Sequence, residues 1–408
     1  MSSKNPPAAP AAGPTPRFTQ VAWVLLDWAA SGFSTVLITL LVAYIEKVAF
    51  ADRPWGLEPG VVWAWTLALA MLASALFTPG FSAWADRKRQ HKTALLTSVA
   101  VGATALGILA VAPPEARLAV LAGVVLANVG FDLAAVFTGS LLATIATGRM
   151  ADRLSAWGFA AGYAGGAIAL VLATAIVGAH DQLGLSTAGG LRAAFAFTGL
   201  WWILFSLPAA VAHFGEDRDG GHATTAAGEL LAFARTLVRP THADHRQLAA
   251  VLIGSMLILG AVQTAIAQFS SVALEEFSLA PAALVRLVLL VQAVALPGAL
   301  AIGWLSERVG RKTALVTCLS GWIAVLVLAG FVQTVPQLYG LAVLLALVLG
   351  GVQSVIRATV AETAPEGRAG VTFGLLQVGA KLAGAIAGLS FGWLYHATGH
   401  PRAGLAAL

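Results

Sequence analysis

Long hydrophobic runs separated by short polar breaks fill the chain from residue 18 onward. Each run is long enough to cross the hydrocarbon core of a bilayer as an α-helix, which takes about 20 residues. No run shows the alternation over about ten residues that is typical of a membrane β-strand. The pattern therefore predicts an all-α, polytopic membrane protein. The eleven predicted spans are residues 18–49, 60–83, 93–112, 117–146, 152–179, 190–213, 247–274, 282–305, 313–333, 336–362 and 369–396.

Charged residues are scarce, which supports this interpretation. The 408-residue chain has 24 Lys and Arg and 19 Asp and Glu, so 11% of its residues are charged. An ordinary soluble domain carries about 25%, and a soluble enzyme of this length is therefore excluded. The net charge of +5 does not indicate nucleic acid as a partner, because the longest basic run, Arg87–Arg89, lies between hydrophobic segments.

Polar segments divide the chain into four parts. Residues 1–17 are rich in Pro and Ala and predict a disordered cytoplasmic tail. Residues 18–213 hold six spans and form an N-terminal half. A central cytoplasmic loop, residues 214–246, leads to residues 247–408, a C-terminal half with five spans. Its last residues, 403–408, resemble the opening turn of a further span that ends too soon to cross, so a twelfth helix is expected to be missing; a natural eleven-span protein is the alternative.

The basic residues predict the orientation in the membrane, because Lys and Arg are retained in cytoplasmic loops. With the N-terminus in the cytoplasm, 16 of the 24 basic residues lie on the cytoplasmic side and 6 lie outside. The other two, Arg357 and Lys381, lie within spans. We therefore expect a cytoplasmic N-terminus.

Internal repeats relate the two halves. The polar break at Ser82–Lys92 recurs 221 residues later at Gly303–Lys312, with an acid–Arg pair and a basic cluster between apolar helices in both copies. Tyr163–Ala169 and Lys381–Ala387 repeat at an offset of 218 residues. Parallel repeats of this kind are typical of transporters built from two halves that rock against each other.

The second copy of this break resembles the loop motif of the major facilitator superfamily, Gly-x-Leu-x-Asp-Arg-x-Gly-Arg-Arg/Lys. It reads Gly303-Trp304-Leu305-Ser306-Glu307-Arg308-Val309-Gly310-Arg311-Lys312. The first copy keeps Asp86 and Arg87, but Ser82 and Arg89 replace the two glycines. The resemblance implies a fold of two six-helix halves and a gating loop that closes the inner side through an acid–Arg contact with a helix N-terminus. The gating residues it implies are Asp86, Arg87, Gly303, Glu307, Arg308, Gly310 and Arg311.

A narrower similarity covers nearly the whole chain and concerns the vacuolar amino-acid effluxer branch of this superfamily, which has bacterial members of this length. The similar segments are Asp27–Phe33, Arg153–Gly166, Gly350–Arg357 and Pro365–Lys381. Two departures remove polar groups near the expected cavity: Ala30 where the branch usually has Asn, and Thr138-Gly139 where it has Tyr-Asn. The resemblance implies a transporter of the bacterial inner membrane, whose substrate should not be carried over from fungal relatives.

Four charged residues lie at membrane depth, where each costs at least about 2.5–3.5 kcal/mol on insertion scales and so requires a role. Asp132 and Asp27 are interpreted as proton-coupling carboxylates, and Arg357 and Lys381 as receptors for an anionic group. The alternative is that the cations pair permanently with Asp27, Asp132 or Glu362, or that Asp27 caps or gates. Amide side chains complete the predicted substrate-binding set: Gln353, Gln377, Asn128, Gln263 and Gln268.

These features predict a secondary transporter that moves a small polar or amphipathic solute, with an amino acid or organic anion favoured, by proton-coupled alternating access. A lipid or amphiphile flippase on the same fold and a transport-inactive membrane scaffold or sensor are the alternatives. An enzyme is not expected, because no face collects His, Cys or carboxylates. The single cysteine, Cys318, and the absence of a phosphate-binding loop predict no metal and no cofactor. We expect a monomer whose partners are the solute, protons and membrane lipids.

Overall fold

The structure is a computed structural model that describes residues 15–56, 59–215, 243–275 and 281–398, together with residues 235, 277 and 279. In these ranges the secondary structure is helical and contains no strand. Eleven helices are long and apolar enough to cross a membrane, one for each hydrophobic run. The prediction of an all-α, polytopic membrane protein is confirmed.

Six spans form the first half, and five form the described part of the second. The first span is continuous but contains two π-helical segments, labelled η1 and η2. The first half comprises α1 (Arg17–Val36), η1 (Leu37–Leu41), α2 (Val42–Tyr44), η2 (Ile45–Ala49), α3 (Pro59–Lys88), α4 (His91–Val111), α5 (Arg117–Ile145), α6 (Gly148–Gly178) and α7 (Thr187–Val211). The second comprises α9 (Ala243–Glu275), α10 (Pro281–Val309), α11 (Arg311–Ala329), α12 (Val335–Thr363) and α13 (Ala369–Thr398).

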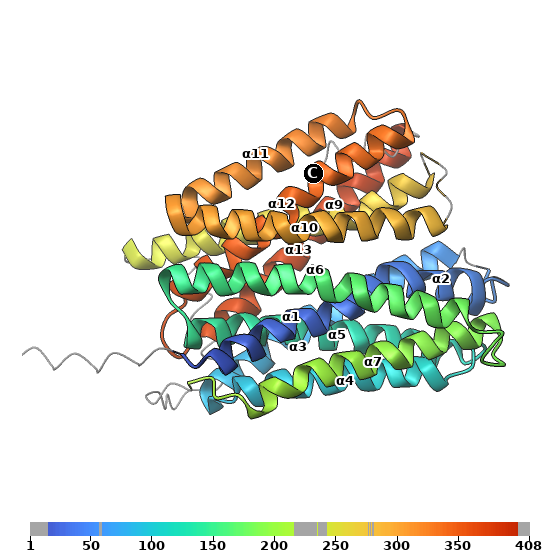
Figure 1. Ribbon diagram of the computed structural model, residues 1–408, viewed down its shortest axis with the longest axis horizontal. Coiled ribbons are helices and arrows are strands. Elements are labelled where there is room, and N and C mark those ends of the chain that lie inside the picture. Colours follow the sequence, from blue (N-terminus) through green and yellow to red (C-terminus); the bar gives the residue numbers. More distant parts are fainter. Residues whose placement is uncertain are drawn as a thin grey trace, which may run out of the picture.

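The helices form two bundles that lie side by side (Figure 1). Within the first half α1 packs on α6 and α4 on α5, and within the second α10 packs on α12 and α9 on α13. Two seams join the halves, because α6 packs against α10 and α12, while α13 packs against α3 and α5. Most of the residues that could hold the halves together therefore lie on these helices.

Glycine lets the helices approach closely at both seams. A Cβ atom on Gly303 of α10 would overlap the Ala156 side chain of α6, and one on Gly374 of α13 would lie 2.5 Å from Ser82 Oγ of α3. Contacts between helix backbones of this kind are common in membranes, where association depends on close packing.

The helix ends correct the predicted polar breaks. α3 continues through Lys88 and α10 through Val309, so the predicted gating loops are mostly helical and are interrupted only at Arg89-Gln90 and at Gly310. α9 begins at Ala243, inside the predicted central loop. Residues 1–14, most of that loop and the predicted start of a twelfth helix beyond Thr398 lie outside the described residues.

Arg89 and Gly310 occupy equivalent positions, and both have a positive φ, 54° and 90° respectively. Glycine adopts this conformation without a steric penalty, whereas another residue pays about 1 kcal/mol. We expect Arg89→Gly to raise the free energy of unfolding by about 0.5–1 kcal/mol, seen as a higher Tm in detergent. Arg87→Gly, placed in helical backbone, should lower it instead. A Tm that falls in Arg89→Gly would contradict this account.

Candidate functional site

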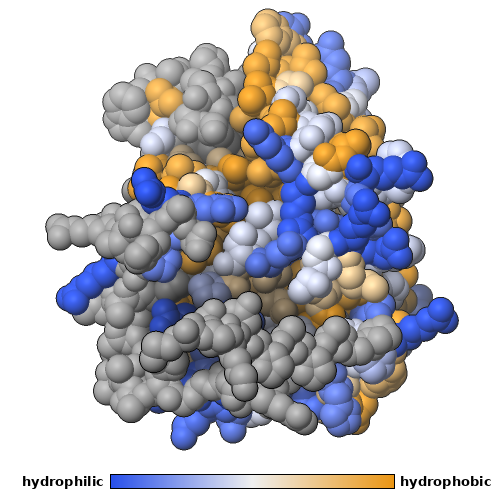
Figure 2. Space-filling view, turned by 90° about the vertical axis from the view of Figure 1, so that its left-hand side faces the viewer, coloured by the Kyte–Doolittle hydropathy of each residue, from blue (hydrophilic) through white to orange (hydrophobic). Residues whose placement is uncertain are grey.

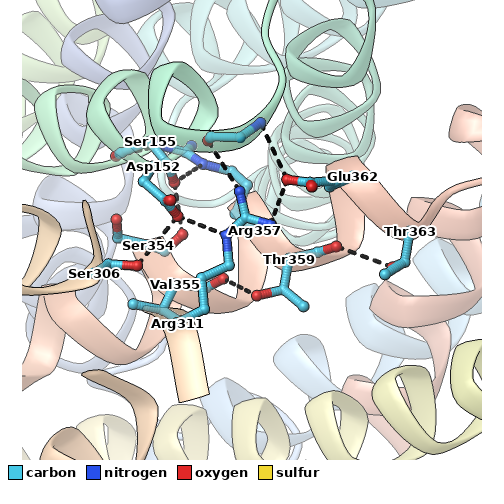
Figure 3. Close-up of polar contacts among 11 residues, drawn as sticks. Asp152, Ser155, Ser306, Arg311, Ser354, Val355, Arg357, Thr359, Glu362 and Thr363 are labelled. Carbon is cyan, nitrogen blue, oxygen red and sulfur yellow. Dashed lines mark hydrogen bonds and ion pairs between the residues drawn. The ribbon is translucent and has the colours of Figure 1, made fainter. Parts of the chain in front are cut away.

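Asp27 of α1 and Arg357 of α12 form a partly buried ion pair between the two halves. Arg357 Nη1 lies 2.7 Å from Asp27 Oδ2 and 3.0 Å from Oδ1. The guanidinium also donates to the hydroxyl and the carbonyl oxygen of Ser155 on α6, at 3.1 and 2.9 Å (Figure 3). It faces the rings of Trp23 and Phe159, 4.7 and 4.3 Å from their centroids. These contacts hold Arg357 on several sides and leave its guanidinium little freedom.

Asp132 of α5 and Lys381 of α13 form a second pair between the halves. Lys381 Nζ lies 3.0 Å from Asp132 Oδ1, and Gln377 Nε2 donates to the same oxygen at 3.2 Å. Asp132 is buried, with 3% of its surface exposed. Among the described residues, one ammonium and one amide contact this carboxylate. The Asp132–Lys381 pair therefore has fewer contacts to break than Arg357 has.

At one end of the bundle, α3 contacts the N-terminus of α13. Asp86 accepts the backbone N–H groups of Gly370 and Val371 at 2.8 and 2.6 Å, one on each carboxylate oxygen. His91 Nε2, at the start of α4, lies 2.7 Å from Asp86 Oδ1. A carboxylate is stabilised in this position by the free N–H groups and the dipole of the helix. We call this contact the first latch, and this end of the bundle the latch end.

The second latch joins α6 to α10 and α11 at the same end. Arg153 Nη2 lies 2.9 Å from Glu307 Oε2, and Arg311 Nε lies 2.7 Å from Asp152 Oδ1. Ser306 donates to Asp152 at 3.2 Å (Figure 3). The two latches occupy equivalent positions of the internal repeat, but the first uses backbone donors and the second uses charged side chains.

Glu362 of α12 belongs to the second latch. It pairs with Arg311, and its Oε2 atom accepts the N–H group of Gly148 at 3.1 Å, so it caps α6 from the opposite half (Figure 3). The sequence suggested Glu362 only as a partner for Arg357 or Lys381. Those cations pair with Asp27 and Asp132 instead.

The pairs and latches lie at successive depths. At 1.5 Å per residue, Asp132 is about 20 Å from the end of α5 and Lys381 about 18 Å from the start of α13. Arg357 is only about 9 Å from the end of α12. These helix ends all lie at the latch end (Figure 1). In a hydrocarbon core of about 30 Å, Asp132 and Lys381 are near the middle, and Asp27–Arg357 lies between them and the latches.

Three of the other predicted amide residues, Asn128, Gln353 and Gln263, have other surroundings. Asn128 donates to the carbonyl of Val124, and Gln353 to that of Leu349, each in its own helix. Gln263 is exposed, and the side chain of Gln268 lies outside the described residues.

The remaining predicted gating residues have other surroundings. Arg308 is exposed and lies over the ring of Trp304, 4.7 Å from its centroid, while Arg87 is half-buried. Gly303 allows the contact with α6, and Gly310 forms the break between α10 and α11. Sequence reasoning missed Ser155, whose hydroxyl donates to the Ser354 carbonyl at 2.8 Å. Its place in the Arg153–Gly166 segment was the only signal.

Glu307→Ala is expected to loosen the latch end, because Arg153 loses its partner in the opposite half. Arg153 is more than half exposed, so the pair contributes less than about 1 kcal/mol and the effect should be modest. In a Cys318→Ala background, a cysteine at the buried position Ala151 should react with a maleimide about two- to fivefold faster. The control Arg308→Ala, which removes no contact between halves, should not change this rate. Equal rates in both variants would count against a gating role for Glu307.

Comparison with known proteins identifies relatives along most of the chain. The family described as "Vacuole effluxer Atg22 like" matches residues 61–408. The uncharacterized MFS-type transporter YxiO of Bacillus subtilis is 26% identical over 375 residues, which are 90% of this chain and 86% of that protein. Autophagy-related protein 22-1 of Sclerotinia sclerotiorum is 24% identical over 282 residues, 62% of this chain and 47% of that protein, so the match spans less than half of the fungal chain.

Solved structures share the fold. The human organic anion transporter MFSD10 has a TM-score of 0.70 at 16% identity and covers 96% of each chain. The proton:xylose symporter XylE, bound to 6-bromo-6-deoxy-D-glucose, has a TM-score of 0.73 at 13% identity, over 96% of this chain and 92% of that one. These likenesses establish the major facilitator fold.

Proposed function

Because this chain belongs to the Atg22-like family and is a transporter of the major facilitator superfamily, we propose that it moves a small polar solute by proton-coupled alternating access. The observation that carries the proposal is the pairing of buried and partly buried charges between the two halves, at Asp27–Arg357 and at Asp132–Lys381. These contacts must break whenever the halves separate. Ion binding that weakens such a contact can therefore control the separation.

Protonation of Asp132 is the proposed coupling event. The ionised carboxylate attracts Lys381 across the seam, and the neutral acid would not, so the pair would weaken when a proton binds. An unpaired ammonium at this depth is strongly disfavoured unless water reaches it. Proton binding would thus favour a state in which the halves have parted at the latch end and the cavity is hydrated.

The charges favour a solute that carries a carboxylate. Lys381 is held by one carboxylate oxygen, whereas Arg357 is also bound to Ser155 and enclosed by aromatic rings. We therefore propose Lys381, with Gln377 beside it, as the group that receives a solute anion, and Arg357 as the residue that holds Asp27. Together with Asp132, this set suits an amino acid or an organic anion.

The protein is a multi-pass integral membrane protein, and we propose the inner membrane of a bacterium, with the latch end in the cytoplasm. Hydrophilic side chains project from much of the latch end (Figure 2). Basic residues gather there, among them Lys88, Lys92, Arg149 and Lys312, as retention of positive charge predicts for the cytoplasmic side. The protein is proposed to act as a monomer in contact with lipid.

Reconstitution into liposomes tests this function. Labelled amino acids and organic anions are offered with and without a pH gradient, and a parallel assay follows the movement of labelled lipid. We expect saturable accumulation of at least one solute, only when the gradient is present. Lipid movement without solute flux would support the flippase alternative, and no flux of any kind would support the scaffold.

A further inference from the structure

Two hydroxyl groups on α3 are buried without a hydrogen-bond partner among the described residues: Ser74 Oγ and Thr78 Oγ1. The two residues are 1% and 0% exposed. A buried polar group left in this way costs about 1–3 kcal/mol, and such groups in folded proteins usually bind ordered water. On the same helix, Thr66 donates to the carbonyl of Val62 at 2.7 Å. Unlike the hydroxyl of Thr66, those of Ser74 and Thr78 have no partner among the described residues of their own helix, and we infer that they bind a ligand.

An acceptor lies on the same turn of α3. Pro79 is inside the helix and has no N–H group, so the carbonyl oxygen of Ala75 lacks its helical hydrogen bond. Proline in a membrane helix is tolerated where water or neighbouring groups satisfy the freed carbonyl. Two hydroxyls and one carbonyl thus offer hydrogen bonds within a single stretch of α3.

The contact between α3 and α5 places these groups at the height of Asp132. The two helices run in the same direction, and the rings of Phe81 and Phe137 meet with centroids 5.3 Å apart. Positions along each helix axis are measured from its ring toward its N-terminus, at about 1.5 Å per residue. Asp132 lies about 7.5 Å from Phe137, whereas Thr78 and Ser74 lie about 4.5 and about 10.5 Å from Phe81. The carboxylate therefore lies between the two hydroxyls in height.

The contact between α3 and α13 gives the same register. A Cβ atom on Gly374 would lie 3.5 Å from the methyl group of Thr78, and α13 runs opposite to α3. Gln377 and Lys381, further along α13, then lie level with the next turn of α3, which carries Ser74. Since α13 packs against both α3 and α5, these groups meet at one three-helix junction.

We propose that the junction of α3, α5 and α13 holds internal water, bound by Ser74, Thr78 and the carbonyl of Ala75, and that this water exchanges protons with Asp132. The inference rests on the proposed proton coupling. Residues four apart on a helix are separated by about 6 Å along its axis, close to two O–H···O distances of about 2.8 Å. One water molecule therefore fits between the two hydroxyls and has several polar partners.

The charge of the site selects water over a metal cation. Lys381 already compensates Asp132, so a second cation would be repelled. In the proposed step, the O–H bond of the Asp132 acid breaks and a new O–H bond to the bound water forms. That water gives one of its other protons to the solvent water of the hydrated cavity, so one proton moves and no other reactant is consumed. Ser and Thr hydroxyls both donate and accept, so they can hold the water in either orientation. Both are positioning residues in this step.

The combination of Ser74→Ala and Thr78→Val tests the proposal, because it removes both hydroxyls with little change in shape. We expect gradient-driven accumulation in proteoliposomes to fall at least about tenfold, since a positioned proton acceptor is lost, while solute exchange without a gradient continues at its normal rate. Thr78→Ser, which keeps a hydroxyl, should retain accumulation. Thr66→Val, which removes a hydroxyl bonded to its own helix, is the matched control and should leave both activities unchanged.

Three results would overturn the proposal: a double variant that behaves like Thr66→Val, an equal loss of accumulation and exchange, or a structure at water-resolving resolution in which the junction is dry. The variant Asp132→Asn distinguishes a failure of the proposed water site from a failure of the proposed proton coupling. If Asp132→Asn loses accumulation and the hydroxyl variants do not, only the water site is wrong. If Asp132→Asn accumulates normally, proton coupling at Asp132 is wrong and the water site falls with it.

Discussion

Asp132→Asn is expected to abolish proton-driven accumulation and to leave exchange of solute across the membrane intact. The asparagine carbonyl can still accept from Lys381 and Gln377, but the side chain neither carries charge nor binds a proton. With one proton moved per solute, a gradient of one pH unit supports about tenfold accumulation. In the variant the internal and external concentrations should become equal, whatever the gradient.

The measurement compares uptake driven by a pH gradient with the exchange of labelled for unlabelled solute in the same proteoliposomes. Asn128→Ala is the matched control, because Asn128 lies one turn earlier on α5 and, within the described part of the chain, its side chain bonds only to its own helix. It should retain both activities. A parallel loss of accumulation and exchange in Asp132→Asn would assign Asp132 a structural role.

Arg357→Gln is expected to destabilise the protein strongly. It leaves the Asp27 carboxylate, whose side chain is only 19% exposed, without its cation. Removing one partner of a buried ion pair typically costs about 3–5 kcal/mol. Arg357→Lys should recover only part of this loss, because an ammonium cannot reproduce the contacts with Ser155 and with both rings. The free energy of unfolding in detergent measures the effect.

A double variant separates the ion pair from the rest of the site. Asp27→Asn combined with Arg357→Gln removes both charges and should be clearly more stable than Arg357→Gln alone, because no buried charge is left uncompensated. If the single variant keeps normal stability, or if the double variant is no better than the single one, Arg357 does not act by holding Asp27.

The hydrophobic pattern predicted every described span because the length of an apolar run is a local property of the chain. It misplaced the ends of α3 and α10, where Asp86, Arg87, Ser306 and Glu307 continue the helix. Hydropathy reports where the membrane ends, and helical backbone extends beyond that point wherever the residues tolerate it.

The identities of the site residues were easier to predict than their contacts. A charge in an apolar run is conspicuous, so Asp27, Asp132, Arg357 and Lys381 could be named from the sequence. Their pairing could not, because Asp27 and Arg357 are 330 residues apart and the partner depends on which helices meet at the seams. The partners of Asp86 are backbone N–H groups, which every residue except proline provides, so no side chain revealed them.

The two halves are expected to separate at the latch end when Asp132 loses its charge. Spin labels are attached at Lys88→Cys and Lys312→Cys in a Cys318→Ala background; both positions are exposed and lie on opposite halves. Pulsed electron paramagnetic resonance then measures the distance between the labels. We predict one short distance at neutral pH, a second and longer distance after acidification, and the longer distance in Asp132→Asn already at neutral pH. A single distance that is the same in all three samples would contradict the account.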